Sequence, residues 1–448
     1  MDFVDAYILA SPGSMLVALV TAIFFFRHAW PHISNKQPYK PTYPALTKED
    51  SNPSVAVSKE PEIPNGWWTG HEVFDLERRA LFSQTWIYLA HSGQFSKAGA
   101  YQSFDVAGFP IFLIRGKDDQ IRAFHNVCRH RAYTITRKET GTSTVLGCRY
   151  HGWSYDTRGQ LVKAPQFDGV PGFDKAQNGL FEIHAHITDQ GWVFVNLVAG
   201  EPTPFEGSVE LALDGFARVA DVESHSGWIA GQTLPGEFNW KMWWWLIYYC
   251  VKVGARRCEH LTTQLEHRVF ETLVPSLTTR IARIFTQASD RAECSLFPST
   301  LLYSFDNAGL WMSFTFLPAS ETRTHVRYDL FTRTPGANSN KETLSHLVEE
   351  VFKELIRNLE LEFQAIMQNP GPQATSELDW STQSTSHQIL TRLQQHAKLE
   401  KTQGAQVRPA MRQPKGSSLF QQAEQLCKEL DCASGSNGNG TSSTGLEW

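Results

Sequence analysis

The two most informative segments of the sequence are NVCRHRAYTI at residues 126–135 and GCRYHGWSYDTRGQL at residues 147–161. Each stretch holds one cysteine and one histidine close together, and these four residues are Cys128, His130, Cys148 and His151. Seventeen residues separate one pair from the other. Two thiolates can hold one iron of a [2Fe–2S] pair while two imidazoles hold the other, which raises the reduction potential above that of an all-cysteine cluster. The pattern therefore predicts an iron–sulfur electron relay.

Strand-forming residues bound each pair, so each pair is expected on a short loop that reaches both irons and leaves its imidazole edge near solvent. Gly147 and Gly152 would permit tight turns, and Tyr150 and Trp153 could shield the sulfurs. The alternative is a structural zinc site, although zinc usually takes its cysteines as C-x-x-C pairs. Visible absorption would distinguish the two, because the cluster is coloured and zinc is not.

The composition indicates a large globular protein. At 448 residues and 50.6 kDa, the chain is long enough for two or three domains. Apolar residues make up 41% and charged residues 19%, and a net charge of -5 gives no electrostatic case for nucleic-acid binding. The seven cysteines are odd in number and widely spread, which favours a reducing compartment over a disulfide-stapled domain.

The N-terminal residues 1–30 are expected to form a membrane anchor. Tyr7–Phe26 is almost free of charge and is close to the roughly 20 residues that span a bilayer. Basic residues follow this run at Arg27, Lys36 and Lys40, which argues against a cleaved signal peptide and places the main body in the cytosol. The alternative is a buried amphipathic helix, because the polar run SPGS interrupts the apolar text.

The rest of the chain is predicted to be α+β. Seven prolines mark residues 31–66 as a linker, and residues 416–448 are expected to form a C-terminal helix followed by a disordered polar tail. Short apolar runs such as YQSFDVAG and GWVFVNL predict antiparallel strands in residues 67–200. Residues 201–415 add the strand-like runs LLYSF, LWMSFTFL and HVRYDLFTR before a three–four apolar spacing predicts a helix over residues 343–368.

With these motifs in place, the sequence resembles the Rieske non-haem iron oxygenases, in particular choline-monooxygenase-like and aromatic-ring-hydroxylating large subunits. The resemblance is close over residues 67–200 and continues more weakly to about 415 through GEFNWK, SLFPSTLLYSF and the C-terminal helix. It implies that Cys128, His130, Cys148 and His151 hold the cluster. It also implies a second domain with a mononuclear Fe(II) on two histidines and one carboxylate.

The same resemblance implies an enzyme that activates dioxygen to hydroxylate or desaturate a small organic substrate. A separate NAD(P)H-dependent reductase would feed the cluster, since the chain contains no G-x-G-x-x-G text for binding a dinucleotide itself. In the family the electrons cross from one subunit to the next, which implies a homotrimer or similar ring.

The segment NWKMWWWLIYYCVKVGARRCEHL at residues 239–261 departs from the family. Its histidines should fall near Lys252 and Arg257, yet no His, Asp or Glu lies between Trp240 and Arg257. Cationic side chains cannot ligate ferrous iron, so the expected ligand pair is missing from this segment.

Substitute ligands for this iron would have to come from elsewhere. His260 and His267 are the nearest histidines, but on a helix they would lie about 10 Å apart along the axis. Glu360 stands where the family places its carboxylate, with Glu362 as the neighbouring alternative, although both could be solvated helix residues.

Two explanations of the departure remain open. Either residues 242–292 carry a gene-model error, which sequencing of the transcript would test, or the protein has lost its mononuclear iron. In the second case it is a membrane-tethered electron carrier or an inactive paralogue of the oxygenases. A zinc-stabilised interaction module is a third class of function.

Overall fold

The computed structural model describes residues 63–167, 169–224, 226–243, 292–305, 310–333, 341–368 and 385–409. The chain divides into two compact units. The larger comprises residues 43–399 with 407–448, and it contains every element below except the end of one helix. The smaller comprises residues 1–42 with 400–406, of which 400–406 are described. Those residues complete the helix α10 (Thr385–Gln403) and extend just beyond it.

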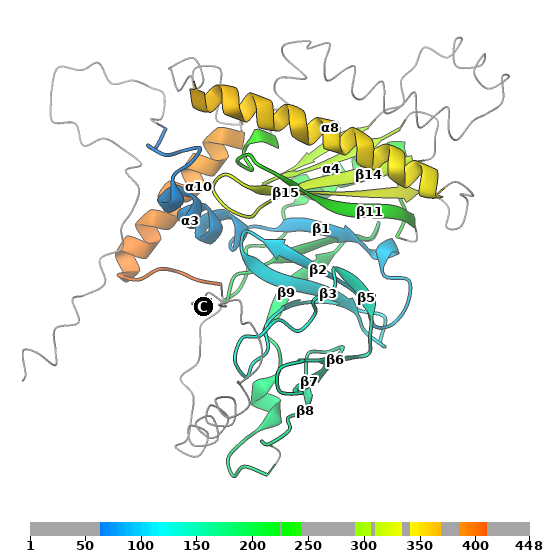
Figure 1. The fold of residues 1–448 in the computed structure, drawn as a ribbon, viewed down its shortest axis with the longest axis vertical. Coiled ribbons are helices and arrows are strands. Elements are labelled where there is room, and N and C mark those ends of the chain that lie inside the picture. Colours follow the sequence, from blue (N-terminus) through cyan, green and yellow to red (C-terminus); the bar gives the residue numbers. More distant parts are fainter. Residues whose placement is uncertain are drawn as a thin grey trace, which may run out of the picture. The chain divides into compact units, whose positions relative to one another are not determined.

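The first half of the larger unit is built on a seven-stranded antiparallel sheet in the order β1-β10-β9-β4-β3-β2-β5 (Figure 1). Its strands are β1 (Ile87–His91), β2 (Ala100–Val106), β3 (Phe109–Arg115), β4 (Ile121–His125), β5 (Thr140–Thr142), β9 (Glu182–Ile187) and β10 (Trp192–Asn196). In β2 buried residues alternate with more exposed ones, as expected for a strand with one face against a core. The helix α3 (His71–Glu77) and a π-helical turn η1 (Arg78–Phe82) precede this sheet.

A small three-stranded sheet is inserted between β5 and β9. It consists of β6 (Val145–Gly147), β7 (Ser154–Asp156) and β8 (Leu161–Lys163), with β7 in the centre. Its side chains help to form a separate core of their own, which includes Trp153, Tyr155 and Phe167. Both predicted cysteine–histidine pairs lie beside this small sheet.

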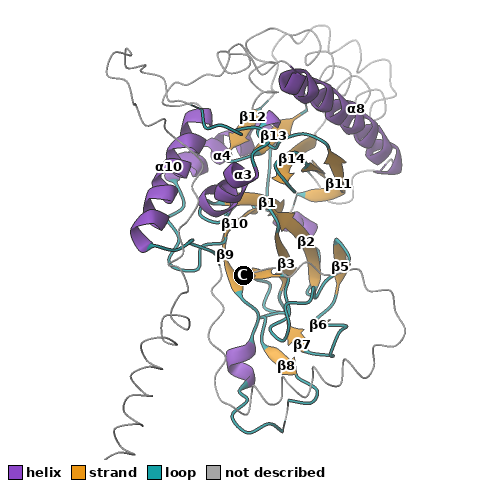
Figure 2. Cartoon of the chain, turned by 60° about the vertical axis from the view of Figure 1, so that its left-hand side comes forward, coloured by secondary structure: helices purple, strands orange, loops and turns teal. Residues whose placement is uncertain are grey.

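The second half contains a five-stranded antiparallel sheet in the order β11-β15-β14-β13-β12. Its strands are β11 (Gly227–Gly236), β12 (Glu293–Leu296), β13 (Thr300–Ser304), β14 (Leu310–Pro318) and β15 (Thr324–Thr332). The long helix α8 (Lys341–Gln368) lies over this sheet, and α4 (Gly207–Ala220) lies near β12 and β13 (Figure 2). The buried face of α8 carries Leu344, Val348, Val351, Phe352, Ile356, Leu359, Phe363 and Ile366.

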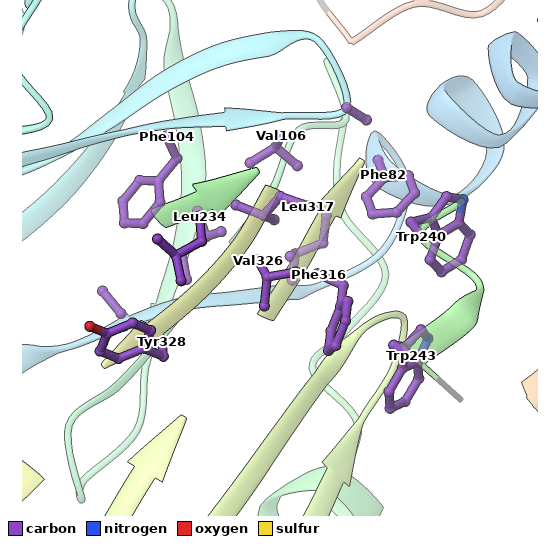
Figure 3. Close-up of a cluster of buried hydrophobic side chains, with 14 of the residues drawn as sticks. Phe82, Phe104, Val106, Leu234, Trp240, Trp243, Phe316, Leu317, Val326 and Tyr328 are labelled. Carbon is purple, nitrogen blue, oxygen red and sulfur yellow. The ribbon is translucent and has the colours of Figure 1, made fainter. Parts of the chain in front are cut away.

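One apolar core joins the two large sheets. Figure 3 shows Phe104 and Val106 of β2 beside Leu234 of β11 and Leu317 of β14. All four residues are at least 93% buried, and each such burial stabilises the fold by about 1.5–3 kcal/mol. The two halves of the larger unit therefore share packing that neither would keep alone.

The predicted α+β class with antiparallel sheets is confirmed. The helix expected over residues 343–368 is α8, and the apolar runs of both halves form strands. No helix among the described residues is long and apolar enough to cross a membrane. The expected anchor at residues 1–30, His260 and His267 lie outside the described residues, as does nearly all of segment 242–292.

Candidate metal centre

Two loops with the same hydrogen-bonding scheme carry the predicted cluster ligands. The first follows β4, where the amide of Cys128 donates to the carbonyl of Tyr133 (2.8 Å) and the amide of Ala132 donates to the carbonyl of Cys128 (2.9 Å). The second joins β6 to β7, where the amide of Cys148 donates to the carbonyl of Trp153 (2.7 Å) and the amide of Gly152 donates back to Cys148 (3.0 Å). Each cysteine therefore begins a turn that closes on itself.

The fifth residue of each turn has left-handed backbone geometry. Gly152 has a φ of 72°, which the sequence anticipates because glycine adopts this conformation without steric cost. Ala132 has a φ of 55° at the equivalent position of the first loop. An alanine gives no sequence signal for such a turn, so the match between the loops is visible only in the structure.

The four side chains gather as two pairs of like kind. The thiols of Cys128 and Cys148 share a hydrogen bond, although they come from different loops. The rings of His130 and His151 lie with their centroids 4.5 Å apart at an interplanar angle of 69°. Both cysteines and His130 are buried, whereas His151 is partly exposed. Only one imidazole thus meets the expectation of an edge near solvent.

This arrangement fits a two-iron cluster. A cluster of this type needs two thiolates on one iron and two imidazoles on the other, so like ligands must come together across the loops. The pairing of thiol with thiol and imidazole with imidazole therefore favours the cluster over a zinc site.

The two thiols differ in how readily they form the thiolates that iron takes as ligands. The hydrogen bond from Cys128 lowers the pKa of Cys148 to about 6 and outweighs the opposing effect of burial. The same hydrogen bond, together with burial, raises the pKa of Cys128. Cys148 is thus the first of the two to lose its proton.

A tyrosine that the sequence analysis did not single out reaches a sulfur. The hydroxyl of Tyr155 on β7 lies 3.2 Å from Sγ of Cys128 and accepts a hydrogen bond from the amide of Arg129 (3.1 Å). The predicted shielding rings lie elsewhere, because Trp153 stacks on His130 at 5.1 Å and Tyr150 lies over His151 at 4.0 Å. These rings cover imidazoles, and the contact to sulfur belongs to Tyr155.

A buried asparagine closes the first loop at its base. The side chain of Asn126 accepts hydrogen bonds from the amides of Ile135 (3.2 Å) and Thr136 (2.9 Å) and donates to the carbonyl of Thr136 (3.0 Å). Asparagine often satisfies backbone groups in turns, so its place two residues before Cys128 was a usable signal. The loop therefore has a rigid base as well as internal hydrogen bonds.

Glu360, the carboxylate predicted to bind the mononuclear iron, contacts a backbone amide. On α8, Oε1 of Glu360 accepts a hydrogen bond from the amide of Glu237 (2.9 Å), just before the text NWK. The partly exposed Glu362 lies on the same helix. Since His260 and His267 lie outside the described residues, the structure brings no histidine of the predicted set to Glu360. It places this carboxylate beside Glu237, two residues before Asn239.

The sequence motif NWK, residues 239–241, has a structural role. Nζ of Lys241 lies 2.6 Å from Oε1 of Glu77, and both side chains are fully buried. Nε1 of Trp240 donates to the other oxygen of Glu77 (2.7 Å), and the Lys241 ammonium lies over the ring of Trp67 at 4.7 Å. Asn239 holds the carbonyls of Trp68 and Glu321 at 2.9 and 2.7 Å. This motif ties α3 to the chain that enters segment 242–292.

The fold and the two paired loops define an iron–sulfur redox domain. The profile of the Rieske [2Fe–2S] domain matches residues 85–174, and the chain carries that domain. A 2-aminobenzenesulfonate 2,3-dioxygenase subunit alpha of Alcaligenes sp is 37% identical over 138 residues, which cover 30% of this chain and 35% of the relative. The carnitine monooxygenase oxygenase subunit of Escherichia coli K12 is 32% identical over 183 residues, 40% of this chain and 47% of the relative. The chain thus spans about a third to a half of the curated relatives it matches.

Solved structures extend the likeness in fold beyond that domain. The apo form of the quaternary ammonium Rieske monooxygenase CntA matches with a TM-score of 0.55 at 20% identity, covering 75% of this chain and 94% of that chain. A naphthalene 1,2-dioxygenase variant bound to phenanthrene matches with a TM-score of 0.53 at 19% identity, covering 67% of this chain and 80% of that chain. The likeness in fold therefore extends over much more of the chain than residues 85–174.

Proposed function

We propose that this protein is the oxygenase component of a Rieske oxygenase system, in which Cys128, His130, Cys148 and His151 hold a [2Fe–2S] cluster. The pairing of the two thiols and of the two imidazoles across matched loops is the observation that carries this proposal. A Rieske cluster supplies one-electron transfer, and a mononuclear ferrous iron in the second domain supplies dioxygen activation. The substrate is a small organic molecule, and a separate NAD(P)H-dependent reductase provides the electrons.

The described residues contribute positioning to this function. Backbone hydrogen bonds and Asn126 fix the two loops, Tyr155 donates a hydrogen bond toward the sulfur of Cys128, and Trp153 holds the ring of His130. Glu360 is the proposed carboxylate of the mononuclear site, because its hydrogen bond to the amide of Glu237 sets it beside the NWK segment. His260 and His267 remain the candidate histidines.

A second candidate function is an electron carrier or an inactive paralogue that keeps the cluster alone. The specific observation in its favour is that no His, Asp or Glu lies between Trp240 and Arg257. Such a protein would accept and release electrons and would need no organic substrate.

Iron and acid-labile sulfide per chain, measured together with an electron paramagnetic resonance spectrum, separate the two functions. The oxygenase predicts three irons and two sulfides, and substitution of His260, His267 or Glu360 should then remove one iron while the spectrum of the reduced cluster persists. Two irons and two sulfides would instead identify the carrier. A preparation with zinc and no sulfide would reject both functions.

Two further expectations belong to this proposal. Sequencing the transcript across residues 242–292 tests the gene-model hypothesis, which fails if the messenger encodes MWWWLIYYC as printed. Tyr7–Phe26 is proposed as a single membrane anchor that leaves the main body in the cytosol. Extraction of cell membranes with alkaline carbonate should leave an anchored protein in the pellet, and its release to the supernatant would count against the anchor.

A further inference from the structure

The part of the chain around the cluster loops carries a charge opposite to that of the whole protein. Residues 128–163 contain seven Lys and Arg against two Asp and Glu, a formal charge of +5 in a chain of net charge -5. One charge of each sign is paired outside the region, since Glu139 pairs with Arg327 of β15 and Arg158 pairs with Asp118 at 3.0 Å. Asp156 accepts the amides of Arg158 and Gln160 at 2.9 Å and keeps its charge, so six cations and one carboxylate are left. The outward charge of this region is therefore basic.

Several basic and apolar side chains of this region are exposed together. Arg137, Lys138, Arg149 and Lys163 are all exposed. Large apolar side chains that are about half exposed come from the small sheet and the second loop, and these are Val145 (52%), Tyr150 (49%) and Val162 (46%). We call these seven residues the basic tip.

Aromatic contacts connect the basic tip to a proposed cluster ligand. The guanidinium of Arg137 lies 5.1 Å from the ring centre of Tyr133, and that ring lies 5.3 Å from the ring of Tyr150. Tyr150 in turn lies 4.0 Å from the ring of His151. A partner that covers Tyr150 would therefore come within one side chain of the partly exposed imidazole.

We propose that the basic tip docks an acidic electron-donor protein, with Tyr150 as its apolar contact. This inference rests on the proposed function, since it names the kind of partner that delivers electrons to the cluster. A basic surface attracts an acidic partner and speeds encounter, and a few half-exposed apolar groups add contact area. One electron passes from the reduced donor to the cluster, so the donor is oxidised and the cluster reduced without any other reagent.

The chemistry of the tip favours a transient donor over a second copy of this chain. Four of its seven residues are Lys or Arg, and permanent interfaces deplete charge and bury larger apolar areas. Electron-transfer encounters are small and are steered by charge. The basic tip has that balance.

The test is stopped-flow reduction of the full-length protein, followed by bleaching of its visible absorption. The probe is a reduced, acidic plant-type [2Fe–2S] ferredoxin, whose potential lies below that of a Rieske cluster. We expect Arg149→Glu/Lys163→Glu to lower the second-order rate constant about tenfold at low ionic strength, with the difference shrinking as salt screens the charges. The matched control Arg357→Glu, which reverses an exposed arginine on α8, should keep the wild-type rate constant.

Two further measurements sharpen the result. Photoreduced lumiflavin, a small neutral donor, should reduce the wild type and the double variant at equal rates. Tyr150→Ser should lower the ferredoxin rate constant several-fold at every salt concentration, and its lumiflavin rate constant separates lost docking from any effect on the cluster through His151.

Equal ferredoxin rates for the double variant and Arg357→Glu, in protein with normal cluster absorption, would overturn the docking inference alone. So would a change in oligomeric mass of the double variant by sedimentation with an unaltered ferredoxin rate, because the tip would then join copies of the chain. Wild-type protein without the visible absorption of a cluster would overturn the proposed function as well.

Discussion

The hydroxyl of Tyr155 sets the environment of one sulfur, and its removal should be measurable. A hydrogen bond to sulfur stabilises the reduced cluster, which carries more negative charge, so Tyr155→Phe should lower the reduction potential. One such bond contributes about 1 kcal/mol, which corresponds to a shift of about 40 mV for a one-electron couple. Tyr88→Phe is the control, since Tyr88 is also buried but contacts Ser313. An unchanged or higher potential in Tyr155→Phe, measured by redox titration, would contradict this role.

A buried neutral histidine should make the fold sensitive to acid. His91 is fully buried, its Nδ1 accepts from the amide of Gly93 (3.1 Å), and its Nε2 faces the carbonyl of Gln190 (2.7 Å). Nε2 therefore carries the proton of the neutral ring. Burial lowers the pKa of His91 to about 4, below its ordinary value of 6.5.

In acid the ring of His91 would take up a second proton, at Nδ1. Because the folded state binds that second proton more weakly than the unfolded state does, the free energy of unfolding should fall as the pH drops from 6.5 towards 4. The full loss from His91 is about 3 kcal/mol. Denaturant unfolding at several pH values measures the slope of the unfolding free energy against pH. That slope should shrink in His91→Gln and persist in His71→Gln, a substitution at an exposed histidine. A slope equal in the wild type and His91→Gln would assign the acid sensitivity to other groups.

At the residue scale, the sequence offers a prediction where the chemistry is local in sequence. Cys128 with His130 and Cys148 with His151 are short patterns, and the structure brings all four side chains together. Tyr155 escaped notice because its partner lies 27 residues away on another loop, and no spacing rule relates the two. The exposure of His130 was predicted wrongly, since Trp153 and Phe167 cover its ring.

The contact between α3 and the NWK segment depends on a buried ion pair. Lys241→Met would leave the Glu77 carboxylate buried without its cation, which costs about 3–5 kcal/mol. Burial lowers the pKa of Lys241, and Glu77 opposes that shift. Glu77→Gln/Lys241→Met removes both charges and keeps an acceptor for Nε1 of Trp240, so it should lose less stability than Lys241→Met. Equal losses in the two variants, measured by denaturant unfolding, would show that the charge pairing contributes little.

Helices and strands could be predicted from the sequence where one spacing of apolar residues persists. The three–four spacing of α8 runs through 28 residues, and its apolar positions are the buried ones. The order of the strands was not predictable, because β9 and β10 return to pair with β4 and β1 after the insertion of the small sheet. Such pairings depend on contacts between residues far apart in the chain, which a local pattern does not encode.

At the scale of the whole molecule, a polar network connects the sheet of the cluster half to the five-stranded sheet. Arg327 on β15 makes two hydrogen bonds of 2.7 Å to Asp329 and pairs with Glu139 beside β5. Gln94 donates to Asp329 (2.9 Å), and Thr233 donates to Glu139 (2.8 Å). Arg327 and Asp329 are each 3% exposed at their side chains, so the centre of this network is buried, whereas Glu139 at its edge is 46% exposed.

Replacing Arg327 should allow the two halves of the larger unit to unfold separately. Arg327→Met leaves the carboxylate of Asp329 buried without its cation, at a cost of about 3–5 kcal/mol. We expect loss of cluster absorption and loss of far-ultraviolet circular dichroism to become separate transitions on heating. Arg333→Met removes an exposed arginine that pairs with Asp221 and should keep the transitions coincident. A single shared transition in Arg327→Met would mean that the apolar core alone couples the halves.

The two matched cluster loops also give the site a direction. Both turns have the same backbone scheme, yet histidine is the third residue of the first turn and the fourth of the second. That offset of one position encloses His130 among aromatic rings and leaves His151 beneath the half-exposed Tyr150. The placement of a single residue thus makes two nearly equivalent loops unequal, and the proposed cluster would have one solvent-accessible imidazole ligand instead of two.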